Sequence, residues 1–351
     1  LPPASMIAIN DLTIEQGNAS AEEYWSLEER IGELNCEPIL SSEEAVDNLK
    51  RILMQSIARQ AVADVPLGAF LSGGIDSSLI VALMQAQSSK RVQTFTVGFD
   101  ELGFDEAPHA QSVARHLVTE HHEIRVSASD ALNVIGALPS IYDEPFADSS
   151  SIPTYLVCQA ARQHVTVALS GDGGDESFGG YSRYMWTKKL WAILNTVPRP
   201  ARPLLAMTLS KIPIKLWDNV FEIVPSRFSI PRAGHRIHRI SEIFRKSDNI
   251  DTLYNELISI WPPLSATNNT RELSSVTHPL KRTGVFEDAE HRMMLRDTLT
   301  YLPDDVLQKI DRAAMAVSLE TRAPFLDHSV VEFAEVYRYI CRLFTQTPTG
   351  S

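Results

Sequence analysis

A glycine-rich turn, Ser72-Gly73-Gly74-Ile75-Asp76-Ser77, contains the residue types that bind phosphate. It follows the apolar run 67–71, and a helix is expected to begin at Asp76 or Ser77. Glycines let the backbone approach a ligand closely, and the first helical turn offers N–H groups without partners. The turn lacks the lysine of a Walker A loop. Its hydroxyls and carboxylate predict a pyrophosphate site with a metal ion on Asp76; a turn that only caps a helix is the alternative.

A second glycine-rich turn, at residues 170–181, follows the apolar run 165–169 and is acidic. Its carboxylates alternate with glycines: Asp172, Asp175 and Glu176. Such a rim repels phosphate unless a divalent cation lies between them, so the sequence predicts Mg²⁺ on Asp76 and Asp175, completed by water and phosphate oxygens. The alternative is an acidic surface turn, which the recurrence of such turns at two strand ends disfavours.

Two cations lie three residues apart in a helical pattern near the C-terminal end. Lys309 and Arg312 share one helical face, and apolar residues cover the other: Ile310, Ala313, Ala314 and Val317. On a face with few acidic neighbours, two cations would stabilise the negative charge that accumulates on a departing pyrophosphate. The alternatives are a solvated surface face or an intrahelical pair with Asp305 or Asp311.

Both turns resemble the motifs of known enzymes. The first is similar to the PP-loop, S-G-G-x-D-S, of ATP pyrophosphatases, which split ATP into AMP and pyrophosphate. The second resembles the signature S-G-D/E-G-G/S-D-E-x-F-G-G-Y of the glutamine-hydrolysing asparagine synthetases. Further matching segments extend the resemblance over nearly the whole chain, in order: 95–99, 121–123, 142–145, 307–316 and 320–327.

The resemblance implies that a carboxylate, the side chain of aspartate in the family, is adenylated by Mg·ATP and then attacked by ammonia to give asparagine and AMP. The ATP-binding residues that it implies are Leu71, Ser72, Gly73, Gly74, Asp76, Ser77, Ser78, Val97, Ser170 and Gly171. It makes Asp76 and Asp175 the Mg²⁺ ligands, and it assigns catalytic roles to Asp172, Lys309 and Arg312. Asp172 replaces a glutamate of the best-studied members, and its shorter side chain reaches about 1.5 Å less.

Alternating strands and helices are expected to position these turns. Apolar or β-branched runs predict strands at 67–71, 92–97, 121–126 and 165–169, and helical periodicity predicts helices at 77–87, 105–117, 128–141 and 151–164. This alternation predicts an α/β fold, a parallel sheet with helices on both faces, followed by a helical C-terminal part. Ligands of such sheets bind beyond the carboxyl ends of the strands, where both turns fall.

Two helix starts are marked by particular residues. Ser41 and Glu44 have capping-box spacing, and one face of the helix that follows is expected to be apolar: Val46, Leu49, Leu53 and Ile57. Asp105 is the predicted N-cap of the helix at 105–117, with Pro108 in its first turn.

Composition limits the kinds of partner. The 351 residues are 44% hydrophobic and 22% charged, which suits one large domain or two, and a net charge of −12 disfavours nucleic acid and anionic membranes. No apolar run approaches the roughly 18 residues of a membrane span. Cys36, Cys158 and Cys341 form no C-x-x-C pair, which predicts a reducing, cytoplasmic setting. The segment 197–246 is rich in Lys, Arg and Pro; solvated, proline-broken helices are favoured there over an RNA-binding patch, because no aromatic residues are interleaved.

The resemblance also predicts how the chain is divided. Residues 1–36 resemble the tail of a glutaminase domain and its linker, and 37–351 resemble the synthetase domain, shortened at its C-terminal end. Leu1 is not the N-terminal cysteine that a glutaminase needs. We therefore expect ammonia to come from glutamine through a glutaminase domain outside this sequence, and the chain alone to use free ammonia. A homodimer stays open.

Other functions compete with this one. A related ligase would activate another carboxylate, either a sugar acid or an amino acid that closes a β-lactam ring. The aspartate-binding groups are not identified, because 146–151 differs from the arginine-containing form of well-known members. A nucleotide-binding scaffold without turnover is disfavoured by the presence of Asp76, Asp172, Asp175 and Lys309. A tRNA-thiolating pyrophosphatase is disfavoured by the lack of paired cysteines and of a basic total charge.

Overall fold

The computed structural model describes residues 3–9, 20–33, 41–99, 105–217, 233–259 and 288–336. The chain divides into two compact units. The first comprises Leu1–Gly180, Leu280–Val285 and Arg296–Ser351, and the second comprises Tyr181–Pro279 and Phe286–Leu295. None of the helices in the described residues is both long enough and apolar enough to cross a membrane.

A five-stranded sheet with the order β5-β4-β3-β6-β7 forms the centre of the first unit. Its strands are β3 (Leu67–Phe70), β4 (Gln93–Phe99), β5 (Glu120–Val126), β6 (Val167–Leu169) and β7 (Glu320–Arg322). Every neighbouring pair is parallel. The chain runs outward from β3 through β4 to β5 and then returns to the other side of β3, so the topological switch point lies between β3 and β6. The predicted α/β fold with a parallel sheet is confirmed.

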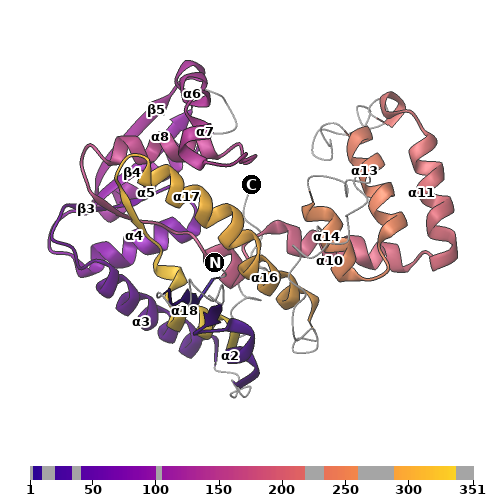
Figure 1. Ribbon diagram of the computed structural model, residues 1–351, viewed down its shortest axis with the longest axis horizontal. Helices are drawn as coiled ribbons and strands as arrows, with labels where there is room; N and C mark the ends of the chain where they lie inside the picture. Colours follow the sequence, from indigo (N-terminus) through magenta and orange to yellow (C-terminus); the bar gives the residue numbers. More distant parts are fainter. Residues whose placement is uncertain are drawn as a thin grey trace. The chain divides into compact units, whose positions relative to one another are not determined.

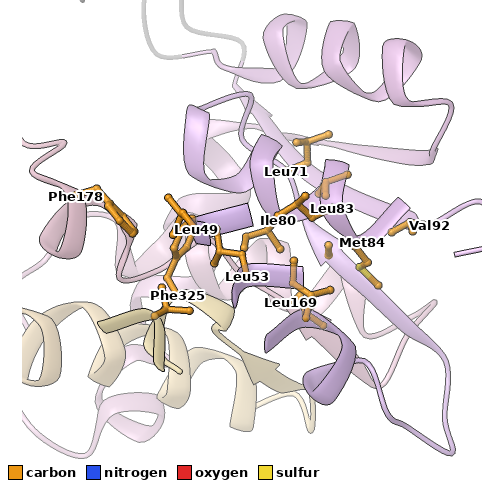
Figure 2. Close-up of a cluster of buried hydrophobic side chains, with 14 of the residues drawn as sticks. Leu49, Leu53, Leu71, Ile80, Leu83, Met84, Val92, Leu169, Phe178 and Phe325 are labelled. Atoms are coloured by element: carbon orange, nitrogen blue, oxygen red, sulfur yellow. The ribbon is translucent and has the colours of Figure 1, made fainter. Parts of the chain in front are cut away.

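Helices cover both faces of this sheet (Figure 1). They are α3 (Ser42–Gln60), α4 (Ile75–Gln87), α5 (Ala107–Leu117) and α18 (His328–Val336) on one face, and α8 (Ser151–Ala161) and α17 (Gln308–Met315) on the other. Side chains alternate along a strand, so neighbours in β6 join different cores: Leu169 packs with Leu53 and Ile80 in the first (Figure 2), and Ala168 packs with Cys158 and Ala313 in the second.

The remaining elements of the first unit are short. An antiparallel pair, β1 (Ser5–Ile7) and β2 (Ala21–Glu23), lies near the N-terminus. The others are α2 (Leu27–Glu33), α6 (Ala128–Ile135), α7 (Leu138–Tyr142), α9 (Gly174–Phe178), the π-helical segment η4 (Leu302–Leu307) and the 3-10 turn η5 (Pro324–Leu326). Helix α16 (Ala289–Leu299) includes residues of both units.

The described residues of the second unit are helical. Its elements are α10 (Ser182–Asn195), the 3-10 turn η1 (Arg199–Ala201), α11 (Arg202–Lys211), α13 (Ala233–Lys246) and α14 (Ile250–Ile258). Leu194, Ile243, Phe244 and Leu253 form its apolar core. The proline-broken helices expected within 197–246 are present, except at residues 218–232, which lie outside the described residues, as do Cys36 and Cys341.

Three local predictions need correction, and one strand was not predicted. Ser41 and Glu44 form the capping box, but Val46 is 50% exposed, because the buried face of α3 passes through Ala45. The N-cap of α5 is Glu106 rather than Asp105. Asp105 is the residue before the N-cap, and its carboxylate accepts hydrogen bonds from the N–H groups of Phe99 and Ala107. The helix predicted at 128–141 is two helices, because Pro139 has no N–H to continue α6 and instead begins α7. The sequence analysis missed β7, whose three residues are polar.

Candidate active site

The two glycine-rich turns leave the same edge of the sheet from adjacent strands. β3 ends at Phe70 and β6 ends at Leu169, and the two strands pair with Ala69 opposite Leu169. The turns at 71–74 and 170–173 therefore begin side by side at the switch point, although about a hundred residues separate them in the sequence.

The first turn is fixed by its own hydroxyls. The N–H of Ser72 donates to Ser77 Oγ at 3.1 Å, the two hydroxyl oxygens lie 3.0 Å apart, and the N–H of Gly74 donates to Ser72 Oγ at 3.2 Å. Gly73 has a φ of +82°, and a Cβ there would lie 2.7 Å from the backbone N of Ala110. Glycine is required at that position, and the turn delivers the chain into α4 with Gly74 as N-cap.

The second turn contacts the first through its glycines. A Cβ on Gly171 would lie 2.8 Å from the N of Ser77, and a Cβ on Gly174 would lie 2.6 Å from the carboxyl carbon of Asp76. The backbone of the second turn thus passes directly against the N-terminal turn of α4. The pattern of glycines in the two turns is explained by this close approach.

Four carboxyl groups gather where the turns meet. Burial, followed by the negative charges of Asp175, Glu176 and Asp172, raises the pKa of Asp76 to about 7. Burial also raises the pKa of Asp172, although a hydrogen bond with Ser170 and the positive charge of Lys309 act in the opposite direction. Partly buried carboxyl groups that repel one another favour the binding of a cation between them.

A cavity of about 780 Å³ opens between the turns. Nine of the predicted residues line it: Ser72, Gly73, Gly74, Asp76, Ser77, Ser170, Gly171, Asp172 and Asp175. Its lining also includes the apolar residues Phe70, Val157 and Ile310. Along the described parts of the chain, no lysine or arginine lines this cavity.

Five predicted residues do not line this cavity. Leu71 is 1% exposed and packs in the core beside Ile80, the buried hydroxyl of Ser78 has no hydrogen-bond partner among the described residues, and Val97 lies within β4. Lys309 and Arg312 belong to α17, whose Ile310 reaches the cavity. Their proposed roles stay predictions.

The donor set suits a magnesium ion bound with its substrate. Within the described residues, no three His, Cys, Asp or Glu side chains converge to form a metal site by themselves. Asp76 and Asp175 both line the cavity, and Mg²⁺ is usually held by one or two carboxylates while waters and phosphates supply its other ligands. A cation that binds both the carboxylates of the two turns and a triphosphate would relieve the mutual repulsion of the carboxyl groups around Asp76.

Both cations of α17 are paired with carboxylates from the loop between α7 and α8. Lys309 Nζ lies 2.6 Å from Asp148 Oδ2, and an Arg312 guanidinium nitrogen lies 3.0 Å from Asp143 Oδ2. The expectation of few acidic neighbours is therefore wrong. The apolar face is as predicted, with Ala313 and Ala314 buried.

The sequence analysis missed the partners of these cations and a second cavity. The stretch 146–151, which contains Asp148, differs from the arginine-containing form of the family. That difference is the feature of the sequence that could have drawn attention to Asp148. The second cavity, of about 610 Å³, shares Ser170, Asp172 and Ile310 with the first and is also lined by Gln60 and Thr321. Asp172 thus lines both cavities.

Comparisons with known proteins agree with this geometry. The family model for asparagine synthase matches residues 48–339. Glutamine-hydrolysing asparagine synthetase 1 of Bacillus subtilis (strain 168) is 32% identical over 303 residues, covering 86% of this chain and 45% of that protein. A Mycobacterium bovis protein, named only as a candidate glutamine-hydrolysing asparagine synthetase, is 34% identical over 291 residues, 82% of this chain and 42% of that protein. The chain thus spans less than half the length of these relatives.

Proposed function

Since this chain belongs to the asparagine synthase family, we propose that it catalyses ATP-dependent amide formation, with the side-chain carboxylate of aspartate as substrate and asparagine, AMP and pyrophosphate as products. The observation that carries the proposal is the cavity between two glycine-rich turns that abut at Gly171 and Ser77. Its N–H groups and hydroxyls suit phosphates, and its carboxylates suit a divalent cation.

In the first half-reaction, an oxygen of the substrate carboxylate attacks the α-phosphorus of ATP. The bond from that phosphorus to the bridging oxygen of the β-phosphate breaks, and pyrophosphate leaves. The N-terminal turn of α4 holds the phosphates with its N–H groups, and Lys309 and Arg312 stabilise the leaving charge. Mg²⁺, held by Asp76 and Asp175, would neutralise charge on the phosphate oxygens.

In the second half-reaction, ammonia attacks the carbonyl carbon of the acyl-adenylate, and the bond to the AMP oxygen breaks. The nitrogen must lose a proton, and Asp172 is the group proposed to accept it. Burial raises the pKa of this carboxyl, which makes it a better proton acceptor than an exposed aspartate. The ammonia is proposed to come from glutamine through a glutaminase domain, as the names of the relatives suggest.

The test is to incubate the protein with Mg·ATP and ammonium, with and without aspartate, and to identify the products. Aspartate-dependent AMP, pyrophosphate and asparagine are expected. ADP in place of AMP would overturn the mechanism. AMP that forms only with a different carboxylate, such as a sugar acid or a β-lactam precursor, would overturn the substrate and keep the chemistry. No carboxylate-dependent nucleotide turnover, with a cooperative thermal transition showing a folded protein, would favour a scaffold.

A further inference from the structure

The loop 143–150 between α7 and α8 contacts α17 through two ion pairs of different character. The Lys309–Asp148 pair is largely buried, with side chains 15% and 21% exposed, whereas the Arg312–Asp143 pair is 43% and 65% exposed. A buried pair loses less of its attraction to solvent screening, so the first pair constrains its lysine far more than the second constrains its arginine.

The Asp148 carboxylate is itself held in place. Its Oδ1 accepts the N–H of Ser150 at 2.8 Å and its Oδ2 accepts the Ser150 hydroxyl at 2.7 Å, directly before α8 begins. Although burial acts to raise the pKa of Asp148, the bonds from Lys309 and Ser150 outweigh it and hold the pKa below its ordinary value. The group is therefore an ionised acceptor with a fixed orientation at neutral pH.

Lys309 also lies close enough to Asp172 for its charge to lower the pKa of that carboxyl. The ammonium group thus has two neighbouring carboxylates, of which Asp148 is the one at bonding distance. If Asp148 were neutral, the ammonium would be attracted to Asp172 instead. That shift would occupy the proposed proton acceptor, which lines the cavity, and would take the ammonium out of the position that Asp148 fixes.

We infer that Asp148 is a positioning residue, which holds Lys309 on α17 next to Ile310 of the cavity wall and keeps Asp172 available to accept a proton. A lysine ammonium group has three N–H donors. One of them binds Asp148, and two remain for the oxygens of pyrophosphate. The inference rests on the proposed function of the cavity.

The chain offers a control, because Asp327 has a similar arrangement, a serine two residues later and a cation on its carboxylate. Its Oδ1 accepts the N–H of Ser329 at 3.0 Å and the Ser329 hydroxyl at 2.6 Å, and Arg59 binds its Oδ2 at 2.5 Å. Asp327 directly precedes α18, as Ser150 precedes α8, but it lines neither of the two cavities described above. Asp327→Asn therefore reproduces the structural loss without the proposed positioning role.

The first experiment compares Asp148→Asn, Asp327→Asn, Lys309→Met and the double variant Asp148→Asn/Lys309→Met. We expect Asp148→Asn to lower kcat for carboxylate-dependent pyrophosphate release about tenfold with KM for ATP within about twofold, an effect of a charged hydrogen bond. Asp327→Asn should lower Tm by a similar amount without changing kcat. In the Lys309→Met background, Asp148→Asn should have no further effect. Independent, multiplying effects, or a faster Asp148→Asn enzyme, would overturn the inference.

A second measurement does not depend on turnover. With ¹³C-labelled aspartate side chains, the Asp172 signal is assigned by its loss in Asp172→Asn and titrated by NMR. We expect the pKa of Asp172 to fall in Asp148→Asn, because Lys309 approaches it, and to stay unchanged in Asp327→Asn. An Asp172 titration that Asp148→Asn leaves unmoved contradicts the inference even if the wild-type protein shows no ligase activity, which would instead count against the proposed function.

Discussion

The two glycine-rich turns begin at adjacent strands and touch each other, yet they differ in what they offer a ligand. The turn at 71–74 leads into α4, a helix of 13 residues, and together with the first residues of that helix, up to Ser77, it carries two hydroxyls and one carboxylate. The turn at 170–173 leads into α9, which has only 5 residues and carries Asp175 and Glu176 in its first turn. Both helices present N–H groups at their first turn, but the longer helix has the larger dipole, and the two carboxylates at the start of the short helix oppose the binding of an anion.

This difference suggests a division of roles within one cavity. The first turn is suited to hold phosphates, and the second is suited to hold a cation and to accept a proton. Asp76 is the exception, because it is a carboxylate on the phosphate side, and Gly174 of the second turn lies against it. The first two predictions concern that residue, and the remaining ones test what fixes the turns.

Asp76→Asn should have the largest effect of the four. The amide keeps the size of the side chain but removes the charge that would bind Mg²⁺, so pyrophosphate release should fall by roughly 10²–10³-fold, the size seen when one electrostatic contact to a transition state is lost. The fold should be retained, since the variant also removes repulsion among the carboxyl groups. The measurement is single-turnover pyrophosphate release with circular dichroism as the control, and normal turnover would remove Asp76 from the metal site.

The pH dependence of stability should also depend on Asp76. Its pKa is about 7 in the folded chain and near its ordinary value in the unfolded one, so between these values the unfolded chain ionises first. The free energy of unfolding should therefore fall as the pH rises, by about 2 kcal/mol between pH 5 and pH 7 from this group alone.

Urea denaturation of wild type and Asp76→Asn at several pH values measures this contribution. The two proteins should be closest in stability at pH 5, and the variant should be the more stable at pH 7.5. Asp148 and Asp327, whose pKa values are lowered, titrate below this window and do not obscure it. Parallel curves for the two proteins would show that Asp76 is already ionised at pH 5.

How much of this site the sequence predicts depends on whether its signals are local. Ser72 to Ser77 and Asp172 to Gly180 have glycine spacing that indicates close backbone approach, and apolar runs before them predict the strands. The ion pair of Lys309 with Asp148 joins residues 161 apart, and no periodicity encodes it. β7 is too short and polar for a strand pattern, and it is identified only by its pairing with β6. Val46 was misplaced because the small residue Ala45 fits the interior equally well.

The contact between the turns can be tested with two alanines. Gly171→Ala would bring a Cβ to 2.8 Å from the N of Ser77, where only backbone could yield, whereas in Gly74→Ala the Cβ meets only Ser72 Oγ, at 3.2 Å. Overpacking of this kind typically costs 1–3 kcal/mol, so we expect about that loss of stability for Gly171→Ala and a much smaller change for Gly74→Ala. Chemical denaturation of both variants gives the comparison, and equal losses would mean that the turns do not rely on each other's backbone.

The smallest expected effect separates two adjacent serines. Ser77 Oγ accepts the N–H of Ser72 and lies beside the Ser72 hydroxyl, whereas the buried hydroxyl of Ser78 has no hydrogen-bond partner in the part of the chain that the structure describes. Ser77→Ala should therefore cost about 1 kcal/mol of stability, the net value of one hydrogen bond, and Ser78→Ala should cost nothing or stabilise the protein slightly. Calorimetry with an ATP analogue measures whether Ser78 has a role in binding. If Ser78→Ala weakens the binding of the analogue without lowering stability, the Ser78 hydroxyl bonds to the ligand. The phosphate site then includes a residue of α4 that does not line the cavity.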